Sequence, residues 1–593
     1  MSNQPPNKPT PYKAAGQANR ILRPVAALIL AFILLGQGIA TPFVKDAEPQ
    51  SAQWIVDIVH NGRWLLPLDY YGLVDRKPPL FYWMAAGISE ATGGYVDETR
   101  ARVVSLIAGA ALATVVLEWT AAMLGTASGW LAFFFLIGSY AFASRATTAL
   151  TDMLMSAFLI AVYYLIHPAL DETRVARSRI VTAGLLLGLG VLTKGPIVIV
   201  LFGFAAAIYL LMLRRNPFIL LTRGWPWMIF AIAIVIAAGW YIPAFLAGRA
   251  HDLSGVFIDE NFGHFMPASM GGTGEAARPV YYILVRLLSG ALPLTLLLPA
   301  IGIAFAHDEF VPSARRPLFF QLAMVLAVLI FFSAASAKRD DYILPALPPL
   351  ATLFAGLFTE VRTEGRASAA KVRDITCLAI LALVFVATIG VTAIGNGLLT
   401  LGSLSAQLQS SDASYASIVV DGLARQNLPF IVFEVALVVA CYVAFTGYRR
   451  NNAARIGAGL AALCVAGSVI WNGVVRPIET YSRSQVAFAA QVRALAAGSP
   501  VYVAYFDPEF AWYYGPDAPP LPGAIAQHGA QANQQVYLVA RPRELNRLAP
   551  PVRRSIHLVL QSHLLGGGGP PALYAIGAAQ SPDEPKGDSS KAN

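Results

Sequence analysis

A charged, proline-stiffened segment runs directly into aromatic residues: positions 75–83 read Asp-Arg-Lys-Pro-Pro-Leu-Phe-Tyr-Trp. The two prolines restrict their own φ angles and carry no backbone donor, so Arg76 and Lys77 before them are held in a defined place. Guanidinium and ammonium groups bind phosphate through charge-assisted hydrogen bonds. Fixed cations beside a bilayer therefore suit a substrate that carries a phosphate on a lipid, and Arg76 and Lys77 are predicted to bind that phosphate.

Further polar residues lie at the ends of apolar runs that the charge distribution places outside the cell. Asp46 and Glu48 follow the first run, and Asp152 opens a later one. The remaining candidates on this face are the cations Lys194, Lys338 and Arg339 and the cavity-lining candidates Tyr82, Arg102, Arg145, Glu260 and Tyr342. Ionisable groups near membrane depth are candidates for a functional site. We expect the cations to bind donor phosphate.

Ordinary structural roles remain open for these residues. Lys77 could anchor its segment by extending its ammonium to lipid headgroups, and the other cations could do the same. Asp152 could stabilise a helix N-terminus, where carboxylates are preferred. Lys194 could close a tight turn, and Asp46 with Glu48 could form a hydrated helix end.

The composition is that of an integral membrane protein. Of the 593 residues, 56% are hydrophobic and 13% are charged, whereas soluble domains average about 25% charged residues. The net charge of +9 comes from basic residues in short loops between apolar runs, which indicates membrane orientation rather than nucleic-acid binding. The three cysteines lie inside apolar runs and support neither disulfides nor a cysteine metal site.

Apolar runs long enough to cross a bilayer predict a polytopic α-helical protein with about thirteen transmembrane helices. They lie at 24–44, 102–123, 128–144, 151–168, 180–193, 196–213, 226–247, 283–306, 317–335, 343–360, 375–395, 428–447 and 456–474. The stretch 180–213 is interpreted as two short spans with Lys194 at the outer turn, because basic residues flank it on both sides.

The same charge pattern predicts the domain organisation. Residues 1–23 form a cytoplasmic tail, and 24–474 form the transmembrane domain of a bacterial inner-membrane protein. In the first periplasmic loop, 45–101, helical patterns around Trp54 and from Pro79 onward predict helices in the membrane interface. Strand-like runs at 501–505 and 535–539 predict a small periplasmic α/β domain over 475–580. The polar tail 581–593 is predicted to be disordered.

Several motifs together resemble those of one family. They are Arg76-Lys77-Pro78-Pro79 with the aromatic residues that follow, Leu150-Thr151-Asp152-Met153, Leu192-Thr193-Lys194-Gly195-Pro196, Glu260-Asn261-Phe262-Gly263-His264-Phe265, and Ser336-Ala337-Lys338-Arg339 leading to Tyr342-Ile343-Leu344-Pro345. Their order and sidedness are similar to those of the ArnT-like and protein O-mannosyltransferase-like membrane glycosyltransferases, which have the GT-C architecture. The resemblance implies transfer of a sugar from undecaprenyl phosphate to a periplasmic acceptor. In ArnT members the sugar is 4-amino-4-deoxy-L-arabinose and the acceptor is lipid A.

The resemblance also assigns roles. It implies catalytic carboxylates at Asp46, Glu48 and Asp152, a phosphate-binding lysine at Lys77, and an outer-loop histidine at His264. Relatives commonly carry an arginine after the first acidic pair, and this chain lacks it; they often have glutamate where this chain has Arg76. Because that glutamate would be a metal ligand, a divalent metal at His264 is left open and no cofactor is assigned.

The sequence thus predicts a periplasm-facing glycosyltransferase that uses a polyprenyl-phosphate sugar as donor. The transferred group would be aminoarabinose-like or a hexose, and the acceptor lipid A, another glycan or a protein. A monomer in the bilayer is expected, with no nucleic-acid partner. The alternatives are a transporter or flippase of a lipid-linked or polar solute, and a membrane-anchored binding protein. Transporters place their polar groups near the bilayer midplane, whereas these charges gather at one face.

Overall fold

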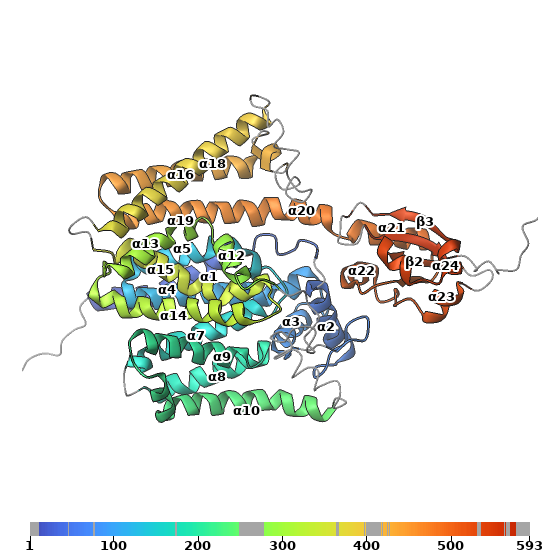
Figure 1. The fold of residues 1–593 in the computed structure, drawn as a ribbon, viewed down its shortest axis with the longest axis horizontal. Helices are drawn as coiled ribbons and strands as arrows, with labels where there is room; N and C mark the ends of the chain where they lie inside the picture. The colour runs from blue at the N-terminus through green and yellow to red at the C-terminus, as the bar shows by residue number, and fades with distance from the viewer. Residues whose placement is uncertain are drawn as a thin grey trace, which may run out of the picture. The chain divides into compact units, whose positions relative to one another are not determined.

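The computed structural model describes residues 11–44, 47–74, 77–171, 175–247, 278–362, 367–396, 398, 417, 419–423, 425, 427–530, 535–562, 564 and 570–576. The chain divides into two compact units (Figure 1). Unit 1 comprises Met1–Ile39, Arg76–Ile88 and Thr99–Ile478, and unit 2 comprises Ala40–Asp75, Ser89–Glu98 and Glu479–Asn593. The described part of unit 1 is built of helices, and unit 2 combines helices with a β-sheet.

The helices from the first span to the start of unit 2's C-terminal segment have these bounds. They are α1 Pro11–Leu35, α3 Leu80–Ala91, α4 Glu98–Leu124, α5 Thr126–Ile137, α6 Tyr140–Ala146, α7 Asp152–Asp171, α8 Arg177–Lys194, α9 Ile197–Met212, η1 Pro217–Thr222, α10 Gly224–Ala247, α12 Tyr282–Gly290, η4 Leu294–Leu297, α13 Leu298–Ala306, α14 Pro312–Ala334, η5 Asp340–Ala346, α15 Leu347–Thr359, α16 Ser368–Gly395, α18 Leu428–Arg449, α19 Ala453–Ile470, the π-helical turn η7 Trp471–Val475, and α20 Arg476–Arg483.

Many of these helices are long and apolar enough to cross a membrane. Within the described residues eight helices meet this condition, or up to ten if each of two bent pairs counts as one span. Outward-facing aliphatic residues such as Val235 on α10 and Val386 on α16 are exposed by 72% and 64%. Such surfaces are stable in hydrocarbon rather than in water. The predicted polytopic helical membrane architecture is confirmed, whereas the count of thirteen crossings stays a prediction.

Two predicted single spans are sharply bent. The run predicted at 128–144 is α5 followed by α6, which meet at 70°, and the run predicted at 283–306 is α12 followed by η4–α13, which meet at 104°. Gly138 separates the first pair and Pro293 lies in the break of the second. Glycine and proline are poor helix formers. Each predicted run therefore contains a bend, and each bent pair can still count as one span.

The stretch 180–213 forms two helices, as predicted. Helix α8 ends at Lys194, and Gly195 follows with a φ of 84°, a conformation that glycine adopts without steric cost. Pro196 then precedes α9, so the chain cannot continue as one helix. This break leaves Lys194 at the terminus of α8.

Small residues allow neighbouring helices of unit 1 to pack closely. A Cβ atom on Gly184 or Gly188 of α8 would lie 2.8 Å from the Cβ of Ile232 or Ile236 on α10. Glycine at helix interfaces lets backbones approach, which is the usual packing device between membrane helices. Helix α8 also packs against α7, so the α7–α8–α10 group forms one wall of unit 1.

The helix predicted around Trp54 exists, but its environment differs from the prediction. Helix α2, Ala47–Asn61, buries Trp54, Ile55 and Ile58 and packs against α22, Pro508–Tyr514, within unit 2. The prediction that this apolar face lies in the membrane interface was wrong, because protein side chains cover it. An amphipathic pattern records that one face is apolar and does not distinguish lipid from protein as its partner.

The C-terminal segment of unit 2 contains a four-stranded sheet with the order β1-β2-β4-β3. Its strands are β1 Val501–Val503, β2 Val536–Ala540, β3 Ile556–Gln561 and β4 Ala572–Ile576. The accompanying helices are α21 Val486–Ala496, α22, α23 Gly523–His528, η8 Pro542–Arg547 and α24 Pro550–Ser555. Strand β1 pairs parallel with β2, in the register Tyr502↔Leu538, and the other pairings are antiparallel.

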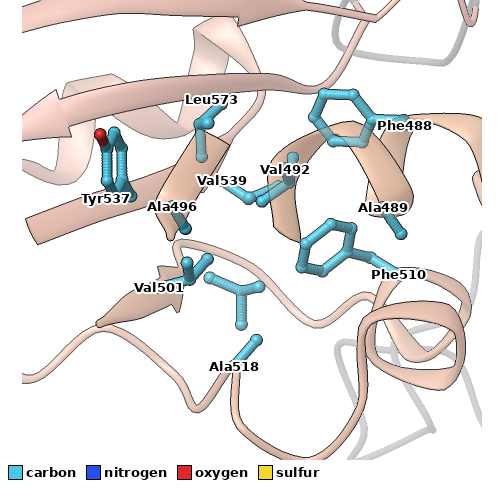
Figure 2. Close-up of a cluster of buried hydrophobic side chains, with 11 residues drawn as sticks. Phe488, Ala489, Val492, Ala496, Val501, Phe510, Ala518, Tyr537, Val539 and Leu573 are labelled. Atoms are coloured by element: carbon cyan, nitrogen blue, oxygen red, sulfur yellow. The ribbon is translucent and has the colours of Figure 1, made fainter. Parts of the chain in front are cut away.

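Strand β2 is covered on both faces of the sheet, and its side chains alternate between the two. Tyr537 and Val539 of β2 pack with Phe488 of α21 and Phe510 of α22 in one core cluster (Figure 2). Leu538, from the opposite face of β2, packs in a second cluster that includes residues of α23 and α24. Every residue of β2 is consequently buried.

Phe510 tests the importance of this core for unit 2. Its ring is fully buried, so Phe510→Ala is expected to lower the free energy of unfolding of the segment by about 3–5 kcal/mol, through lost transfer energy and an unfilled cavity. Near-UV circular dichroism during heating of the full chain measures the change. Phe506→Ala is the matched control, because Phe506 is 44% exposed. Equal thermal stability of the two variants would contradict this account of the core.

Candidate active site

A nearly buried ion pair joins the ends of two neighbouring helices of unit 1. Asp152 opens α7 and Lys194 closes α8, and the Lys194 ammonium donates a hydrogen bond to the Asp152 carboxylate. Their side chains are only 10% and 14% exposed. The ammonium also lies over the ring of Tyr342, 5.0 Å from its centroid, where the π system attracts a cation. These three predicted site residues are therefore brought together.

Two further cations surround Asp152. The charges of Lys77 and Arg339 both act electrostatically on its carboxylate. Lys77 belongs to the sequence motif that first suggested phosphate binding, and Arg339 directly precedes η5. Arg339 Nη2 also lies 3.9 Å from Asp341 Oδ2. The structure thus groups Lys77, Lys194 and Arg339, three of the five predicted phosphate-binding cations, around a single carboxylate.

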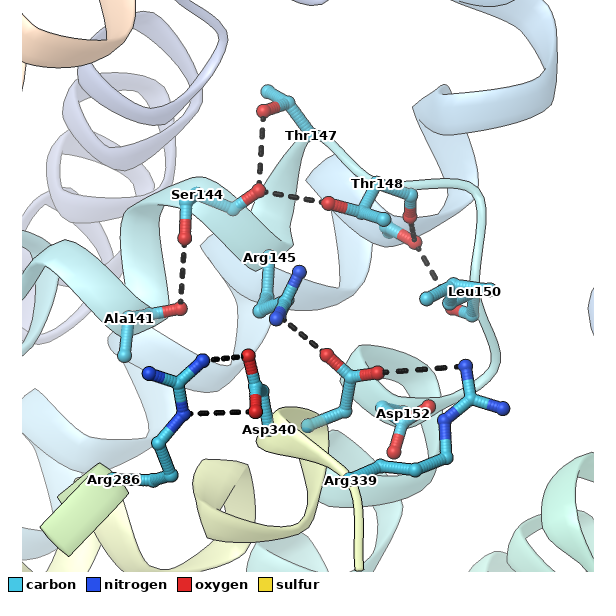
Figure 3. A network of polar contacts seen from close by, with 12 residues as sticks. Ala141, Ser144, Arg145, Thr147, Thr148, Leu150, Asp152, Arg286, Arg339 and Asp340 are labelled. Atoms are coloured by element: carbon cyan, nitrogen blue, oxygen red, sulfur yellow. Dashed lines mark hydrogen bonds and ion pairs between the residues drawn. The ribbon is translucent and has the colours of Figure 1, made fainter. Parts of the chain in front are cut away.

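A network of arginines and aspartates continues from this group (Figure 3). Arg145 at the end of α6 approaches Asp341, with Nε 2.5 Å from Oδ1. Arg286 of α12 binds the neighbouring Asp340 with both ends of its guanidinium, Nε donating at 2.8 Å. Tyr282 donates its hydroxyl to the same carboxylate. Two consecutive aspartates at the start of η5 therefore hold two arginines in fixed directions.

The cluster carries an excess of positive charge. Its cations are Lys77, Arg145, Lys194, Arg286 and Arg339, and its anions are Asp152, Asp340 and Asp341. Among these named side chains the cations outnumber the carboxylates by two. Cations bind phosphate through charge-assisted hydrogen bonds, so this group suits an anionic ligand such as a phosphate.

The turn before Asp152 is fixed by side chains from other helices. Ser105 of α4 donates its hydroxyl to the Thr148 carbonyl at 2.6 Å, and Arg476 Nη1 donates to the Thr147 hydroxyl at 2.9 Å. The Thr151 hydroxyl is buried and has no hydrogen-bond partner within the described residues. Arg102 is buried and donates to the Ile39 carbonyl at 3.0 Å, which ties α4 to the end of the first span. The predicted cavity residue Arg102 thus supports the scaffold.

Lys338 lies beside the cluster but is engaged with the backbone. Its ammonium donates to the carbonyls of Arg278, at 2.9 Å, and Ala335. Burial lowers the pKa of Lys338. In this conformation the lysine holds the segment between α14 and η5 against the residues before α12, and its role in binding phosphate stays a prediction.

The remaining predicted residues are distributed as follows. Tyr82 of α3 is buried in unit 1, and Glu48 is buried in the first turn of α2 in unit 2. Asp46, Arg76, Glu260 and His264 lie outside the described residues. Within the part of the chain that the structure describes, no three His, Cys, Asp or Glu side chains group as a metal site. The metal at His264 therefore stays a prediction.

Arg286 and Tyr282 were missed by sequence reasoning, because both lie inside or beside the apolar run predicted as a span. A lone arginine within such a run is itself a signal, since a charge at membrane depth is costly and is retained where it has a partner. Asp340 supplies that partner here.

Comparisons with known proteins give the chain a family context. The family model described as dolichyl-phosphate-mannose-protein mannosyltransferase matches residues 76–242. An undecaprenyl phosphate-alpha-4-amino-4-deoxy-L-arabinose arabinosyl transferase from Pseudomonas savastanoi pv. phaseolicola is 28% identical over 377 residues, which cover 61% of this chain and 66% of that relative. The protein of the same name from Shewanella sediminis is 26% identical, over 62% of this chain and 64% of the relative. The chain spans less than two thirds of the length of these relatives.

Solved structures extend the likeness over nearly the whole chain. The crystal structure of ArnT from Cupriavidus metallidurans bound to undecaprenyl phosphate matches with a TM-score of 0.66 and 20% identity, covering 94% of this chain and 97% of that one. The apo structure of the same protein gives 0.67. The chain is thus similar in sequence to these arabinosyl transferases and similar in fold to ArnT. The predicted resemblance is confirmed. The range matched by the family model, residues 76–242, includes Lys77, Arg145, Asp152 and Lys194.

The Asp152–Lys194 pair can be tested by a double-mutant cycle. Lys194→Met alone leaves the Asp152 carboxylate without its ammonium partner, and Asp152→Asn alone leaves the ammonium without its carboxylate. Each single change is expected to destabilise the folded protein by about 3–5 kcal/mol, because the desolvated charge that remains has lost its counter-charge. The combined variant removes both charges and is expected to recover most of that loss. Thermal unfolding in detergent provides the measurement, and additive losses in the double variant would show that the two groups are not coupled.

Proposed function

We propose that the chain transfers a sugar from undecaprenyl phosphate to an acceptor in the bacterial envelope. The observation that carries the proposal is the group of cations around Asp152, which has an excess of positive charge where a lipid phosphate could bind. The relatives are named for transfer of 4-amino-4-deoxy-L-arabinose from undecaprenyl phosphate. We extend this donor class to the chain, and we propose lipid A or another envelope glycan as acceptor.

The chemistry follows from the charges. When the bond between the sugar's anomeric carbon and the phosphate oxygen breaks, negative charge grows on the departing lipid phosphate. Lys77 and Arg339 would stabilise that charge through fixed donors, which lowers the energy of the transition state. Asp152 would orient Lys194 toward the phosphate, because its carboxylate holds the Lys194 ammonium at the end of α8. An acceptor phosphate would attack unaided once positioned, whereas an acceptor hydroxyl would need a carboxylate base, for which Asp46 and Glu48 are the candidates.

The proposal also includes the side of the membrane on which the cation cluster lies. We place the cluster on the periplasmic side of the inner membrane, with the 475–580 segment on that side as well. Support comes from the basic loops that flank the α8–α9 pair, since such loops favour the cytoplasm. It also comes from the helix ends: α7 begins and α8 ends at the cluster, so the two antiparallel helices present these termini to one side.

Lys77 provides the direct test of donor binding. Lys77→Ala is expected to lower the transfer rate by about 100-fold or more, because a charge-stabilising donor is lost from the transition state. Transfer from a polyprenyl-phosphate sugar is measured in proteoliposomes. Lys371→Ala is the matched control, since Lys371 is exposed at the start of α16. Unchanged transfer in Lys77→Ala would refute the site, and substrate movement across liposomes without a new glycosidic product would favour the transporter alternative.

The acceptor can be identified from the envelope molecule that loses a sugar in cells that lack the protein. If an envelope glycolipid is the acceptor, deletion is expected to remove one sugar mass from that molecule, and wild-type protein should restore it. Mass spectrometry of lipid A and of the other envelope glycans distinguishes the candidates. The Lys77→Ala chain, produced at the same level, should fail to restore the mass. Identical glycan and lipid A masses with and without the protein would contradict the acceptor class.

A further inference from the structure

A second polar pocket lies within unit 2, formed by segments that are far apart in the sequence. Helices α2 and α22 pack together there (Figure 1). The pocket has a volume of about 660 Å³ and is lined mainly by His60, Asn61, Arg63, Tyr70, Tyr95 and Trp512. Small-molecule sites typically measure about 300–1,000 Å³. The space is therefore sufficient for one or two sugar rings.

Two buried carboxylates hold the wall of this pocket in place. Asp57 accepts hydrogen bonds from the Asn61 amide at 2.7 Å, from Arg63 Nη1 at 3.0 Å and from the Leu68 amide at 2.8 Å. Asp69 accepts from the backbone amides of Tyr71 and Leu73, both at 2.9 Å, and from the Gln50 side chain at 3.0 Å. Their bonds fix the loop between α2 and Val74 before any ligand arrives, which lowers the entropic cost of binding.

The side chains that face the pocket combine aromatic rings with hydrogen-bonding groups. Tyr95 is 52% exposed, and the Trp512 ring is oriented by a bond from its indole nitrogen to Glu98 Oε1 at 3.3 Å. Burial raises the pKa of Tyr70, so its hydroxyl stays neutral and able to donate. Around these rings stand the imidazole of His60 and the amide of Asn61, which both donate and accept.

The charge of the lining argues against an anionic ligand. Asp57 and Asp69 contribute two negative charges and Arg63 one positive charge, so these three lining residues together carry a net charge of −1. A phosphate or carboxylate would be repelled, and a purely apolar ligand would leave the polar side chains without partners. A saccharide fits both restrictions, because its hydroxyls donate and accept hydrogen bonds while its C–H faces pack on aromatic rings.

We infer that this pocket binds a neutral or amino-bearing saccharide unit, and that the unit belongs to the glycan of the acceptor. Saccharide binding stands on the pocket alone, whereas the acceptor role rests on the proposed function. Unit 2 would thereby select which glycan receives the sugar, and the cation cluster of unit 1 would carry out the transfer.

Saccharide binding is tested on the full chain in lipid nanodiscs, which keep sugar-based detergents out. Saturation-transfer NMR with glucosamine and N-acetylglucosamine as separate ligands should show a signal from at least one of the two sugars. Tyr95→Ala should weaken the sugar signal by about 5-fold or more, since an aromatic packing surface is lost. His60→Ala is a second variant at an exposed lining position. Tyr481→Ala, an exposed tyrosine of unit 2 outside the pocket lining, should bind as the wild type does.

Binding of neither sugar, or equal signals in Tyr95→Ala and Tyr481→Ala, would overturn the inference. The acceptor role has its own readout. In the transfer assay Tyr95→Ala should raise KM for the acceptor at unchanged kcat and unchanged KM for the donor. Lost saccharide binding with an unchanged acceptor KM would refute the acceptor role. Because Lys77→Ala should lower the transfer rate and keep saccharide binding, failure of the proposed function and failure of this inference are distinguishable.

Discussion

The cost of desolvating charge governs the arrangement of unit 1. An isolated ion taken out of water loses several kcal/mol of hydration, and only a close counter-charge with good geometry repays it. The nearly buried Asp152–Lys194 pair meets this requirement at the termini of two packed helices. Once that pair is fixed, a further cation near Asp152 is stable only if another anion is close. Arg339 has Asp341, Arg145 has Asp341 as well, and Arg286 has Asp340. The whole network follows from repeated use of this one constraint.

The same constraint explains why the cluster suits a charged substrate. A site whose charges were fully balanced would gain little from binding phosphate, because each cation would have to exchange one anion for another. The named cations of this group outnumber its named carboxylates by two, which favours an anionic ligand. Rigid support matters equally, since donors that must reorganise lose their advantage in the transition state. Ser105, Arg102 and Arg476 supply that support from neighbouring helices, without contributing to the charge around Asp152.

Much of the helical architecture could be predicted from the sequence, because hydropathy over about 20 residues reports membrane spans directly. The break at Gly195–Pro196 was also predictable, since loops rich in arginine flank both sides. The bends at Gly138 and Pro293 were not, because both residues lie within runs whose average hydropathy hides a local change of direction. Helix α2 shows a different limit. Its apolar face is plain in the sequence, but its partner α22 lies far along the chain, and only folding reveals it.

The site residues also differ in how far the sequence alone predicts them. Lys77, Asp152, Lys194 and Arg339 could be proposed from residue type and expected sidedness, and the structure groups them. Which cation pairs with which carboxylate depends on helix packing: Asp340 and Asp341 are adjacent in sequence, yet they bind arginines from different helices, α12 and α6. The pocket of unit 2 gave no sequence signal, because its aromatic and polar residues come from three segments with no shared motif. A transferase needs both kinds of site. Phosphate binding depends on charged residues, which can be recognised in the sequence. Glycan selection depends on the shape of a pocket, which forms only when segments distant in the sequence pack together.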